Sequence, residues 1–310
     1  MLVELDARTN VGRIRAGNED NYLVLDLSNA KAWVGSETGE APDGLRRFEL
    51  GERGLVLVVS DGMGGALAGD VASRMAVETV RDMLMGNGVQ EHICPPDMPL
   101  IECLRNATEY ANFAIHRKSQ DDARCSGMGA TLTAVAVTDD GLDFLQVGDS
   151  RAYVIRDSQI KLATKDQSLV QQLVDVGQNS EEEAETHMFR NVILQALGAQ
   201  AELAPVTGRV RLRQGDMLLL CSDGLSGKLR AEDIINIISS ADEDLGKACD
   251  ELVSEANHRG GEDNITVILA RFTGTDLPVP DSRKITVEMP SNDSDRTLRF
   301  EEDDDDTQNP

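Results

Sequence analysis

The chain has 310 residues, and its 55 Asp and Glu residues against 30 Lys and Arg residues give a net charge of −25 at pH 7. A surface of this charge repels phosphodiester backbones, so we expect no nucleic-acid partner. The apolar content of 40% is enough for a packed core, and because aromatic residues make up only 3% of the chain we expect an aliphatic one.

No stretch approaches the roughly 18 apolar residues of a membrane span, and the first ten residues lack the pattern of a signal peptide. We therefore expect a cytoplasmic monomer that does not bind membranes. The cysteines are odd in number and lack CxxC spacing, and one lies inside an apolar strand pattern, which favours reduced residues that pack in the core. They are Cys94, Cys103, Cys125, Cys221 and Cys249.

Hydrophobic periodicity and turn residues predict the secondary structure. In chain order the pattern gives strands 22–27 and 55–60, helices 70–84 and 101–115, strands 130–137, 144–147 and 152–155, helix 168–176, strand 217–222, helices 231–240 and 245–257, and strand 265–270. Asp139-Asp140-Gly141 is a hairpin-turn signal, and Ser180 with Glu183 forms a capping box. The polar segment 28–53 is expected to be a surface insertion of unknown role.

Strands in hairpins that alternate with pairs of helices favour an α+β fold over a parallel βαβ arrangement. We expect antiparallel sheets with helices on their outer faces, in one domain that spans residues 5–272. Residues 273–310 carry 11 acidic against 4 basic residues and few apolar ones. They cannot bury enough apolar surface to fold alone, so we expect a disordered acidic tail that solvates the protein. A docking or self-inhibitory role of this tail stays open.

Four aspartates stand where apolar runs stop or start. Asp61 follows GLVLVVS, Asp149 follows the run 144–148, Asp223 follows MLLLCS, and Asp263 precedes NITVILA. Rigid β backbone holds such carboxylates at fixed separations, and hard oxygen ligands suit Mg²⁺ or Mn²⁺. If the strands are antiparallel, Asp61, Asp223 and Asp263 reach the same rim of a sheet, which predicts a site for two divalent metal ions.

A single Asp-Gly pair is only a turn signal, but this chain carries an ordered series of motifs. They are Arg-x-x-Asn-Glu-Asp at 15–20, SDGMGG at 60–65, GATLTA at 129–134, VGDSRAY at 147–153, SDGL at 222–225 and GGEDNITV at 260–267. In this combination the chain resembles the metal-dependent serine/threonine protein phosphatases of the PPM family (protein phosphatase type 2C), bacterial branch. The resemblance covers about residues 5–272.

The resemblance implies a four-layer α-β-β-α sandwich, with two antiparallel sheets between pairs of helices and a binuclear metal site at one end. It also implies a role for each matched residue. Asp61 bridges both Mn²⁺ or Mg²⁺ ions, the Gly62 carbonyl ligates one ion, Asp223 and Asp263 hold the other, Arg15 binds the substrate phosphate, Glu19 and Asp20 order metal-bound waters, Asp149 is a ligand of a third, weaker ion, and Asn191 assists it from a flap.

The chemistry of phosphate esters supports this assignment. A phosphate monoester dianion repels nucleophiles, and its hydrolysis is among the slowest uncatalysed reactions. Two divalent ions about 3.5–4 Å apart lower the pKa of a shared water and neutralise charge on the transferring group. We expect in-line attack by a hydroxide that bridges the two ions, without a phosphoenzyme. Met63 stands where some relatives carry a proton-donating His, so the general acid is not identified.

The resemblance extends to substrates, which would be phosphoserine and phosphothreonine proteins, and to bacterial serine/threonine kinases as the opposing enzymes. The stretch 166–196 matches a flap, and we expect its glutamates at 181–183 and 185 to favour basic or extended phosphopeptides.

Alternatives stay open for individual residues and for the whole chain. Asp149 also suits a hairpin turn, Asn191 a helix cap, and Glu19 with Asp20 a structural role at a strand entry. The chain could instead be a non-enzymatic PPM-like binding module, or a partner-switching phosphatase that acts on a phosphorylated anti-sigma antagonist.

Overall fold

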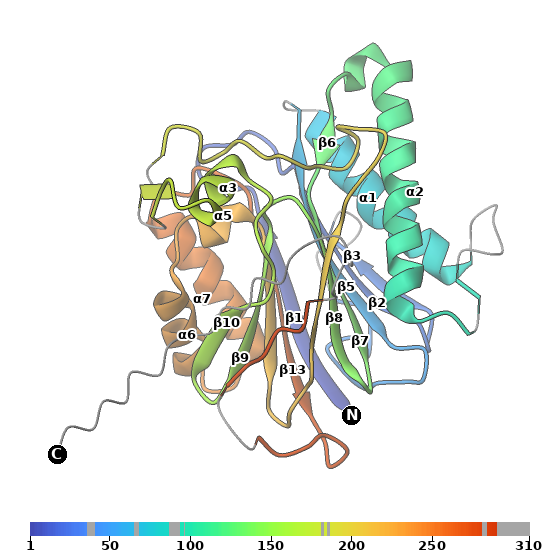
Figure 1. Ribbon diagram of the computed structural model, residues 1–310. Coiled ribbons are helices and arrows are strands. Elements are labelled where there is room, and N and C mark those ends of the chain that lie inside the picture. Colours follow the sequence, from blue (N-terminus) through green and yellow to red (C-terminus); the bar gives the residue numbers. More distant parts are fainter. Residues whose placement is uncertain are drawn as a thin grey trace.

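Two antiparallel sheets packed face to face form the centre of the molecule, seen in a computed structural model of the chain (Figure 1). The structure describes residues 1–35, 41–64, 68–86, 94–95, 97–180, 183–184, 187–280 and 284–289. One sheet has the strand order β10-β9-β12-β13-β1-β4, and the other has the order β11-β8-β7-β5-β2-β3 with β6 added beside β5. Every strand pair in both sheets is antiparallel.

The strands are β1 (Leu2–Asn10), β2 (Asp20–Asp26), β3 (Lys31–Val34), β4 (Arg47–Glu49), β5 (Leu55–Met63), β6 (Gly129–Ala130), β7 (Leu132–Thr138), β8 (Gly141–Val147), β9 (Arg151–Arg156), β10 (Gln159–Leu162), β11 (Val206–Val210), β12 (Met217–Cys221) and β13 (Ile265–Thr273). The helices are α1 (Ala68–Met85), α2 (Leu100–Asp121), α3 (Leu169–Asp175), α5 (Asp223–Ser226), α6 (Ala231–Ser240) and α7 (Leu245–His258), with a 3-10 turn at Ala123–Cys125.

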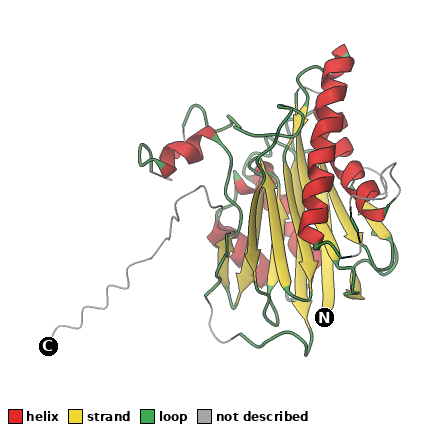
Figure 2. Cartoon of the chain, turned by 45° about the vertical axis from the view of Figure 1, so that its right-hand side comes forward, coloured by secondary structure: helices red, strands yellow, loops and turns green. Residues whose placement is uncertain are grey.

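The helices cover the outer faces of both sheets, as the sequence predicted. Helices α1 and α2 pack on the sheet that contains β5, and α6 and α7 pack on the sheet that contains β12 (Figure 2). The α+β class and the four-layer α-β-β-α sandwich are therefore confirmed. Among the described residues, no helix is both long enough and apolar enough to cross a membrane.

Apolar side chains fill three separate layers, and this explains why the strand patterns are so continuous. In β5, Leu55, Leu57 and Val59 face the core between the sheets, whereas Val56 and Val58 face α1. Because a strand with both faces buried needs apolar residues at every position, β5 reads as an unbroken apolar run. The core is aliphatic, as predicted, with a few aromatic side chains between the sheets.

Strand β1 was missed by the sequence analysis. It pairs along its whole length with β13, from Leu2 opposite Thr273 to Asn10 opposite Ile265. Its apolar residues Val3, Leu5 and Ala7 enter the core between the sheets. Charged residues alternate with them, so the segment lacks the apolar run by which the other central strands were recognised.

The polar segment 28–53 is not a simple surface insertion. It supplies β3 at the edge of one sheet and β4 at the edge of the other. Trp33 is fully buried in the core between the sheets and meets Tyr22 edge to face, with 5.4 Å between the ring centres. A few buried side chains within a polar sequence were enough to anchor both edges.

The packed structure also continues past the predicted boundary at residue 272. Leu277 and Ile285 are buried in the core between the sheets. Glu288 pairs with Arg209 on the edge strand β11 through two backbone hydrogen bonds of 2.7 and 2.8 Å. The expectation of a wholly disordered tail is therefore wrong for 284–289, and the acidic run 301–306 lies outside the described residues.

The prediction of five reduced cysteines is also wrong. Cys94 and Cys103, at the start of α2, form a disulfide. The other three are free and buried, as predicted: Cys125, Cys221 and Cys249. Cys94 directly precedes Pro95-Pro96, and no local pattern indicates that it meets Cys103.

One buried ion pair links β9 to the turn before its neighbour β12 in the same sheet. Arg156 on β9 forms two hydrogen bonds with the Asp216 carboxylate, at 2.8 and 2.7 Å, and its side chain is 6% exposed against 0% for Asp216. The same guanidinium donates to the backbone carbonyls of Arg211 and Lys284. One side chain thus holds the strand β9, the turn before β12 and the segment 284–289.

We expect Asp216→Ala to lower the free energy of unfolding by about 3–5 kcal/mol, because it leaves the Arg156 charge buried without its partner. Urea denaturation at pH 7 measures this change. Asp121→Ala is the control, since Asp121 pairs with Arg117 on the exposed surface and its loss should change little. Equal effects of the two substitutions would contradict the assigned role of the buried pair.

Candidate active site

The predicted carboxylates gather where the two sheets meet, at the end of the sandwich where α5 begins (Figure 1). Asp223 follows β12 and Asp263 precedes β13, and these strands are antiparallel neighbours, so both carboxylates reach one sheet edge. Asp61 comes from β5 in the other sheet, directly opposite Asp20 on β2. The expectation that one rim of one sheet carries all three is wrong, since the site spans the gap between two sheets.

The electrostatics show how close these groups lie. Burial raises the pKa of Asp61 well above its ordinary value, and the charges of Asp20, Asp223, Asp149 and Asp263 raise it further. Burial and the Asp263 charge also raise the pKa of Asp223, while a hydrogen bond with the Asp61 side chain opposes this. Asp61 and Asp223 are therefore close enough to interact, and the other carboxylates are near enough to repel them.

Asp20 and Glu19 lie beneath this cluster. The Ser222 hydroxyl donates to Asp20 Oδ2 at 2.7 Å, and burial raises the pKa of Asp20 to about 7. Burial also raises the pKa of Glu19, which the Arg15 charge partly offsets. Both side chains are buried, so the second layer of the site is itself acidic.

Arg15 reaches the cluster from the loop between β1 and β2. Its Nη2 lies 2.7 Å from Asp263 Oδ2, its Nη1 lies 3.8 Å from Glu19 Oε2, and its side chain is 47% exposed. A guanidinium that is anchored by one face and open on the other can meet an incoming anion.

Asn264, which the sequence analysis did not single out, fastens that loop. Its Nδ2 donates to the carbonyls of Val11 at 2.8 Å and Gly17 at 3.0 Å, and its Oδ1 accepts from the Glu19 N–H at 2.8 Å. The loop also needs Gly12, whose φ is +80° and whose missing Cβ would lie 2.2 Å from the Asp263 carbonyl oxygen. Asn264 lies in the motif GGEDNITV of the sequence, but its hydrogen-bond partners come from a distant segment and are brought to it only by folding.

Gly62 allows another close approach. A Cβ at this residue would lie 2.1 Å from the Gly69 carbonyl oxygen at the start of α1 and 2.7 Å from the Glu19 carbonyl oxygen. The Gly62 N–H donates to that Glu19 oxygen at 3.1 Å. The SDG turn is thus pressed against both the second layer of the site and α1. Gly65, from the same motif, lies outside the described residues.

Asp149 lies close enough to join the cluster, whereas Asn191 does not join it here. Burial raises the pKa of Asp149 to about 7, with contributions from the charges of Asp223 and Asp166. Arg151, two residues later, forms an ion pair with Asp166 at 2.7 Å. Asn191 is exposed in a turn, and the described contacts do not link it to Asp149. The flap glutamates 181, 182 and 185 lie outside the described residues.

The chemistry of the donor set fits divalent cations. Three buried carboxylate oxygens have no hydrogen-bond partner: Glu19 Oε1, Asp20 Oδ1 and Asp223 Oδ1. Within the described ranges, however, no three His, Cys, Asp or Glu side chains form a closed metal-binding group. Asp263 explains this, because its oxygens accept from Arg15 and from the Asn264 N–H and so face protein donors. The repulsion among the remaining acids is the stronger indication of cation binding.

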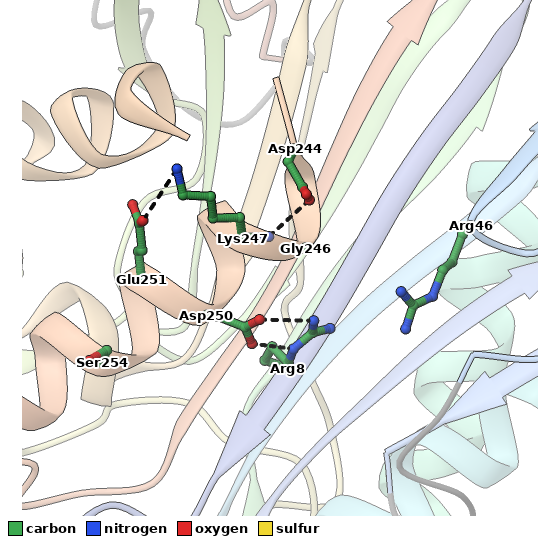
Figure 3. Close-up of a pocket in the computed structure, with 8 residues that line it drawn as sticks. All are labelled: Arg8, Arg46, Asp244, Gly246, Lys247, Asp250, Glu251 and Ser254. Atoms are coloured by element: carbon green, nitrogen blue, oxygen red, sulfur yellow. Dashed lines mark hydrogen bonds and ion pairs between the residues drawn. The ribbon is translucent and has the colours of Figure 1, made fainter. Parts of the chain in front are cut away.

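A cavity of about 570 Å³ lies elsewhere, over the first half of α7 (Figure 3). Arg8 crosses it and donates to Asp250 at 2.6 and 3.3 Å, and Arg8 also pairs with the buried Asp6. Arg46 reaches the same Asp6 at 3.1 Å. The charged residues around the cavity therefore pair with one another, and none of the residues that line the cavity is a predicted site residue.

Fold and site together define a hydrolase of phosphate esters with a carboxylate-lined centre, and comparisons with known proteins give the family. Residues 43–264 match the protein phosphatase 2C family. The serine/threonine phosphatase stp of Listeria welshimeri is 34% identical over 263 residues, which cover 84% of this chain and 93% of that protein. The protein phosphatase PhpP of Streptococcus pneumoniae is 38% identical over 221 residues, which cover 71% and 87%.

Solved structures agree with these relatives. The catalytic domain of the serine/threonine protein phosphatase PstP, in complex with two manganese ions, aligns with a TM-score of 0.68 and 30% identity over 88% of this chain and 99% of that one. A bacterial serine phosphatase aligns with a TM-score of 0.73 and 30% identity, covering 88% and 98%. The chain belongs to the protein phosphatase 2C family, bacterial PPM type, and is a serine/threonine protein phosphatase.

The raised pKa values give the metal-free protein a pH-dependent stability. Asp20 and Asp149 have pKa values of about 7 in the folded protein against about 3.9 when unfolded. Between these values the folded state binds more protons, so we expect the free energy of unfolding to fall as pH rises from about 4 to 7. Asp122 and Asp233 have lowered pKa values of about 2, so their titration changes the free energy of unfolding only below this pH range.

Thermal melting in EDTA at pH 5.0 and 7.5 measures this effect, and the metal-free protein should melt at the higher temperature at pH 5.0. Mn²⁺ at about 100 times its Kd should restore about 2.7 kcal/mol per site at pH 7.5. The Asp149→Asn variant should show a shallower pH dependence in EDTA. A melting temperature that rises with pH in EDTA would contradict the assigned pKa shifts.

Proposed function

We propose that this phosphatase hydrolyses phosphoserine and phosphothreonine in a single displacement by water, at a site that takes two Mn²⁺ or Mg²⁺ ions. The observation that carries the proposal is the set of buried carboxylate oxygens without partners, beside Asp61 and Asp223 carboxyl groups that are close enough to interact. The manganese complex of PstP, whose fold matches, supports the choice of metal. Bound divalent ions supply a water of lowered pKa and neutralise charge on the transferring phosphate.

Each carboxylate has its own part in holding the ions. Asp61 stands between the two sheets and would bridge the pair, with the Gly62 carbonyl as a further ligand of one ion. Asp223 and Asp263 share the edge of the other sheet and would hold the second ion. Glu19 and Asp20 lie behind them, where their unpartnered oxygens can accept hydrogen bonds from metal-bound waters. Asp149, near Asp223, would hold a third and weaker ion.

Arg15 would bind the phosphate. In this structure its guanidinium pairs with Asp263, and about half of its side chain is exposed. With Asp263 as a ligand of a metal ion, the guanidinium of Arg15 would be free to donate two parallel hydrogen bonds to phosphate oxygens. Both charged side chains would then still have a partner of opposite charge.

The side chains around the cluster favour water over a protein nucleophile. The Ser60 hydroxyl is fully buried and donates to the Thr131 carbonyl at 2.7 Å. The Ser222 hydroxyl is also fully buried and donates to Asp20. Burial raises the pKa of the Cys221 thiol to about 12, so it is not a thiolate at neutral pH. The two hydroxyls already donate hydrogen bonds and the thiol is protonated at neutral pH, so none of the three is a ready nucleophile. This supports hydrolysis without a phosphoenzyme.

Substrates and cellular setting belong to the same proposal. We expect phosphorylated proteins in the cytoplasm, among them activation loops of serine/threonine kinases, with the enzyme acting as a monomer. Accumulation of activation-loop phosphothreonine in cells that carry only the Asp223→Asn enzyme would test the opposition to kinases.

The Asp223→Asn variant tests the metal assignment, since it removes one charge without changing shape. We expect turnover of para-nitrophenyl phosphate and of a phosphothreonine peptide with Mn²⁺ to fall by about 10³-fold, as loss of several kcal/mol of charge stabilisation requires. EDTA should abolish the wild-type activity. Asp242→Asn is the matched control, because Asp242 is 93% exposed and its φ of 52° suits Asn. Full turnover by the Asp223→Asn enzyme would refute the site.

Arg15→Ala tests phosphate binding. Hydrogen bonds to a charged group contribute about 1.5–3 kcal/mol, so we expect kcat/KM to fall by about 10- to 100-fold, chiefly through KM. Mn²⁺ affinity, measured by calorimetry, should hold or rise because Asp263 loses its competing partner. Arg13→Ala, two residues earlier on the same exposed loop, serves as control. A loss of Mn²⁺ binding without a rise in KM would contradict this role.

A further inference from the structure

A buried pair of hydroxyl groups joins the peptide of Asp61 to the loop that carries Asp149. Thr131 Oγ1 lies 2.7 Å from Ser150 Oγ. The same Thr131 oxygen accepts from the Asp61 N–H at 2.9 Å, and the Thr131 N–H donates to the Asp61 carbonyl at 2.8 Å. Thr131 therefore holds both backbone groups of Asp61 while its hydroxyl contacts the neighbour of Asp149.

Ser150 is fixed on its backbone as well. Its carbonyl accepts from Gln146 Nε2 at 2.7 Å and lies 2.7 Å from Thr133 Oγ1, whose one proton is shared between this carbonyl and Gln146 Oε1, also 2.7 Å away. These four polar side chains are at most 1% exposed, and they lie on or next to the hairpin of β7 and β8. A fully bonded buried network of this kind has one arrangement, because a broken bond would leave a buried polar atom unsatisfied.

The other side of Asp149 is held from the base of the flap. The Gly148 N–H donates to Gln167 Oε1 at 2.8 Å, and the Gln167 N–H donates to the Gly148 carbonyl at 2.9 Å. The residues before and after Asp149 are thus both pinned. Its own carboxylate, by contrast, is repelled by Asp223 and Asp166. The loop dictates where that carboxylate points, and the hydroxyl pair ties the loop to Asp61.

A hydroxyl has one proton and two lone pairs, so the order of donors along this path is constrained. Thr131 Oγ1 already accepts from Asp61, and one proton lies between it and Ser150 Oγ. A movement of the Asp61 peptide changes the lengths of these hydrogen bonds and so acts on Ser150. The free energy of ion binding at Asp61 would then depend on the ion at Asp149, and this dependence is reciprocal.

We infer that the Thr131–Ser150 hydroxyl pair is a positioning device that couples Asp61 to Asp149, so that a divalent ion at Asp149 binds cooperatively with the pair of ions at Asp61. This inference rests on the proposed function, because it needs ions at both carboxylates. The two hydroxyls bond to each other, and Thr131 also bonds to the Asp61 N–H, so they act through the backbone beside each aspartate.

Calorimetric titration of the metal-free full chain with Mn²⁺ tests the coupling, and Thr131→Val removes the hydroxyl while keeping the shape. We expect the weaker class of Mn²⁺ sites to lose about tenfold in affinity, the range found for outer partners of metal ligands. Asp149→Asn identifies that class by abolishing it. Thr108→Val is the matched control, since Thr108 is equally buried in α2 and only donates to the Leu104 carbonyl.

Three further variants complete the test. Ser150→Ala should weaken the same class to the same extent, and the double variant should lose no more than either single one, because both remove one hydrogen bond. Thr131→Ser, which keeps the hydroxyl, should restore wild-type binding and separates the coupling from a folding defect. Hydrogen exchange at the Asp61 amide should speed up in Thr131→Val but not in Thr108→Val.

The outcomes separate this inference from the proposed function. If Thr131→Val gives the same Mn²⁺ titration curve as Thr108→Val, the coupling is refuted, while the proposed site for two ions is unaffected. Additive losses in the double variant overturn it as well. A wild-type chain that binds no Mn²⁺ refutes the proposed function itself.

Discussion

Mutual repulsion among carboxylates dominates this end of the molecule, and much of the surrounding structure serves to hold them together. Asp61 and Asp223 approach each other across the gap between two sheets, and burial and the charges of other carboxylates raise the pKa of both. Such an arrangement costs stability unless protons or cations neutralise it. The folded chain bears that cost because rigid strands hold the carboxylates in place, and the arrangement suits the divalent metal ions of the proposed function.

The double sandwich supplies this rigidity. Strand β5 has both faces buried, so the segment that delivers Asp61 cannot shift without disturbing two apolar layers. The antiparallel pair of β12 and β13 brings Asp223 and Asp263 to one edge, although they are 40 residues apart in the sequence. The sheets are fastened to each other by their apolar core and by Arg156 on β9, which donates to the Arg211 carbonyl just after β11. Site geometry therefore depends on packing well away from the site.

Neutral polar side chains complete the site from beneath. Asn264 ties the Arg15 loop to the strand of Asp263, and Ser222 ties Asp20 to the end of β12. Thr131 holds the peptide of Asp61. All three are buried, and each forms a hydrogen bond with an acidic residue, namely Glu19, Asp20 or Asp61. One oxygen each of Glu19, Asp20 and Asp223 stays without a hydrogen-bond partner. These hydrogen bonds from neutral side chains help to hold the like-charged carboxylates in place in the metal-free protein.

The sequence by itself determined the layers and the acidic residues of the site. Seven apolar runs were enough to locate most central strands, since a strand with two buried faces must be apolar throughout. The Asp residues at the ends of those runs were visible for the same reason. Strand β1 escaped because its charged residues alternate with three apolar ones, and β3 and β4 escaped because a few buried side chains anchor otherwise polar segments.

Tertiary structure alone decided which edges meet. That Asp61 faces Asp223 from the opposite sheet, that Cys94 bonds Cys103, and that 284–289 extends the edge at β11 are contacts that pairing and packing bring together. Local sequence patterns report which face of an element is apolar, and they carry no information about its distant partner. The hydroxyl pair of Thr131 and Ser150 belongs to the same class, because a Thr and a Ser 19 residues apart become a connection only when β7 and β8 fold into a hairpin.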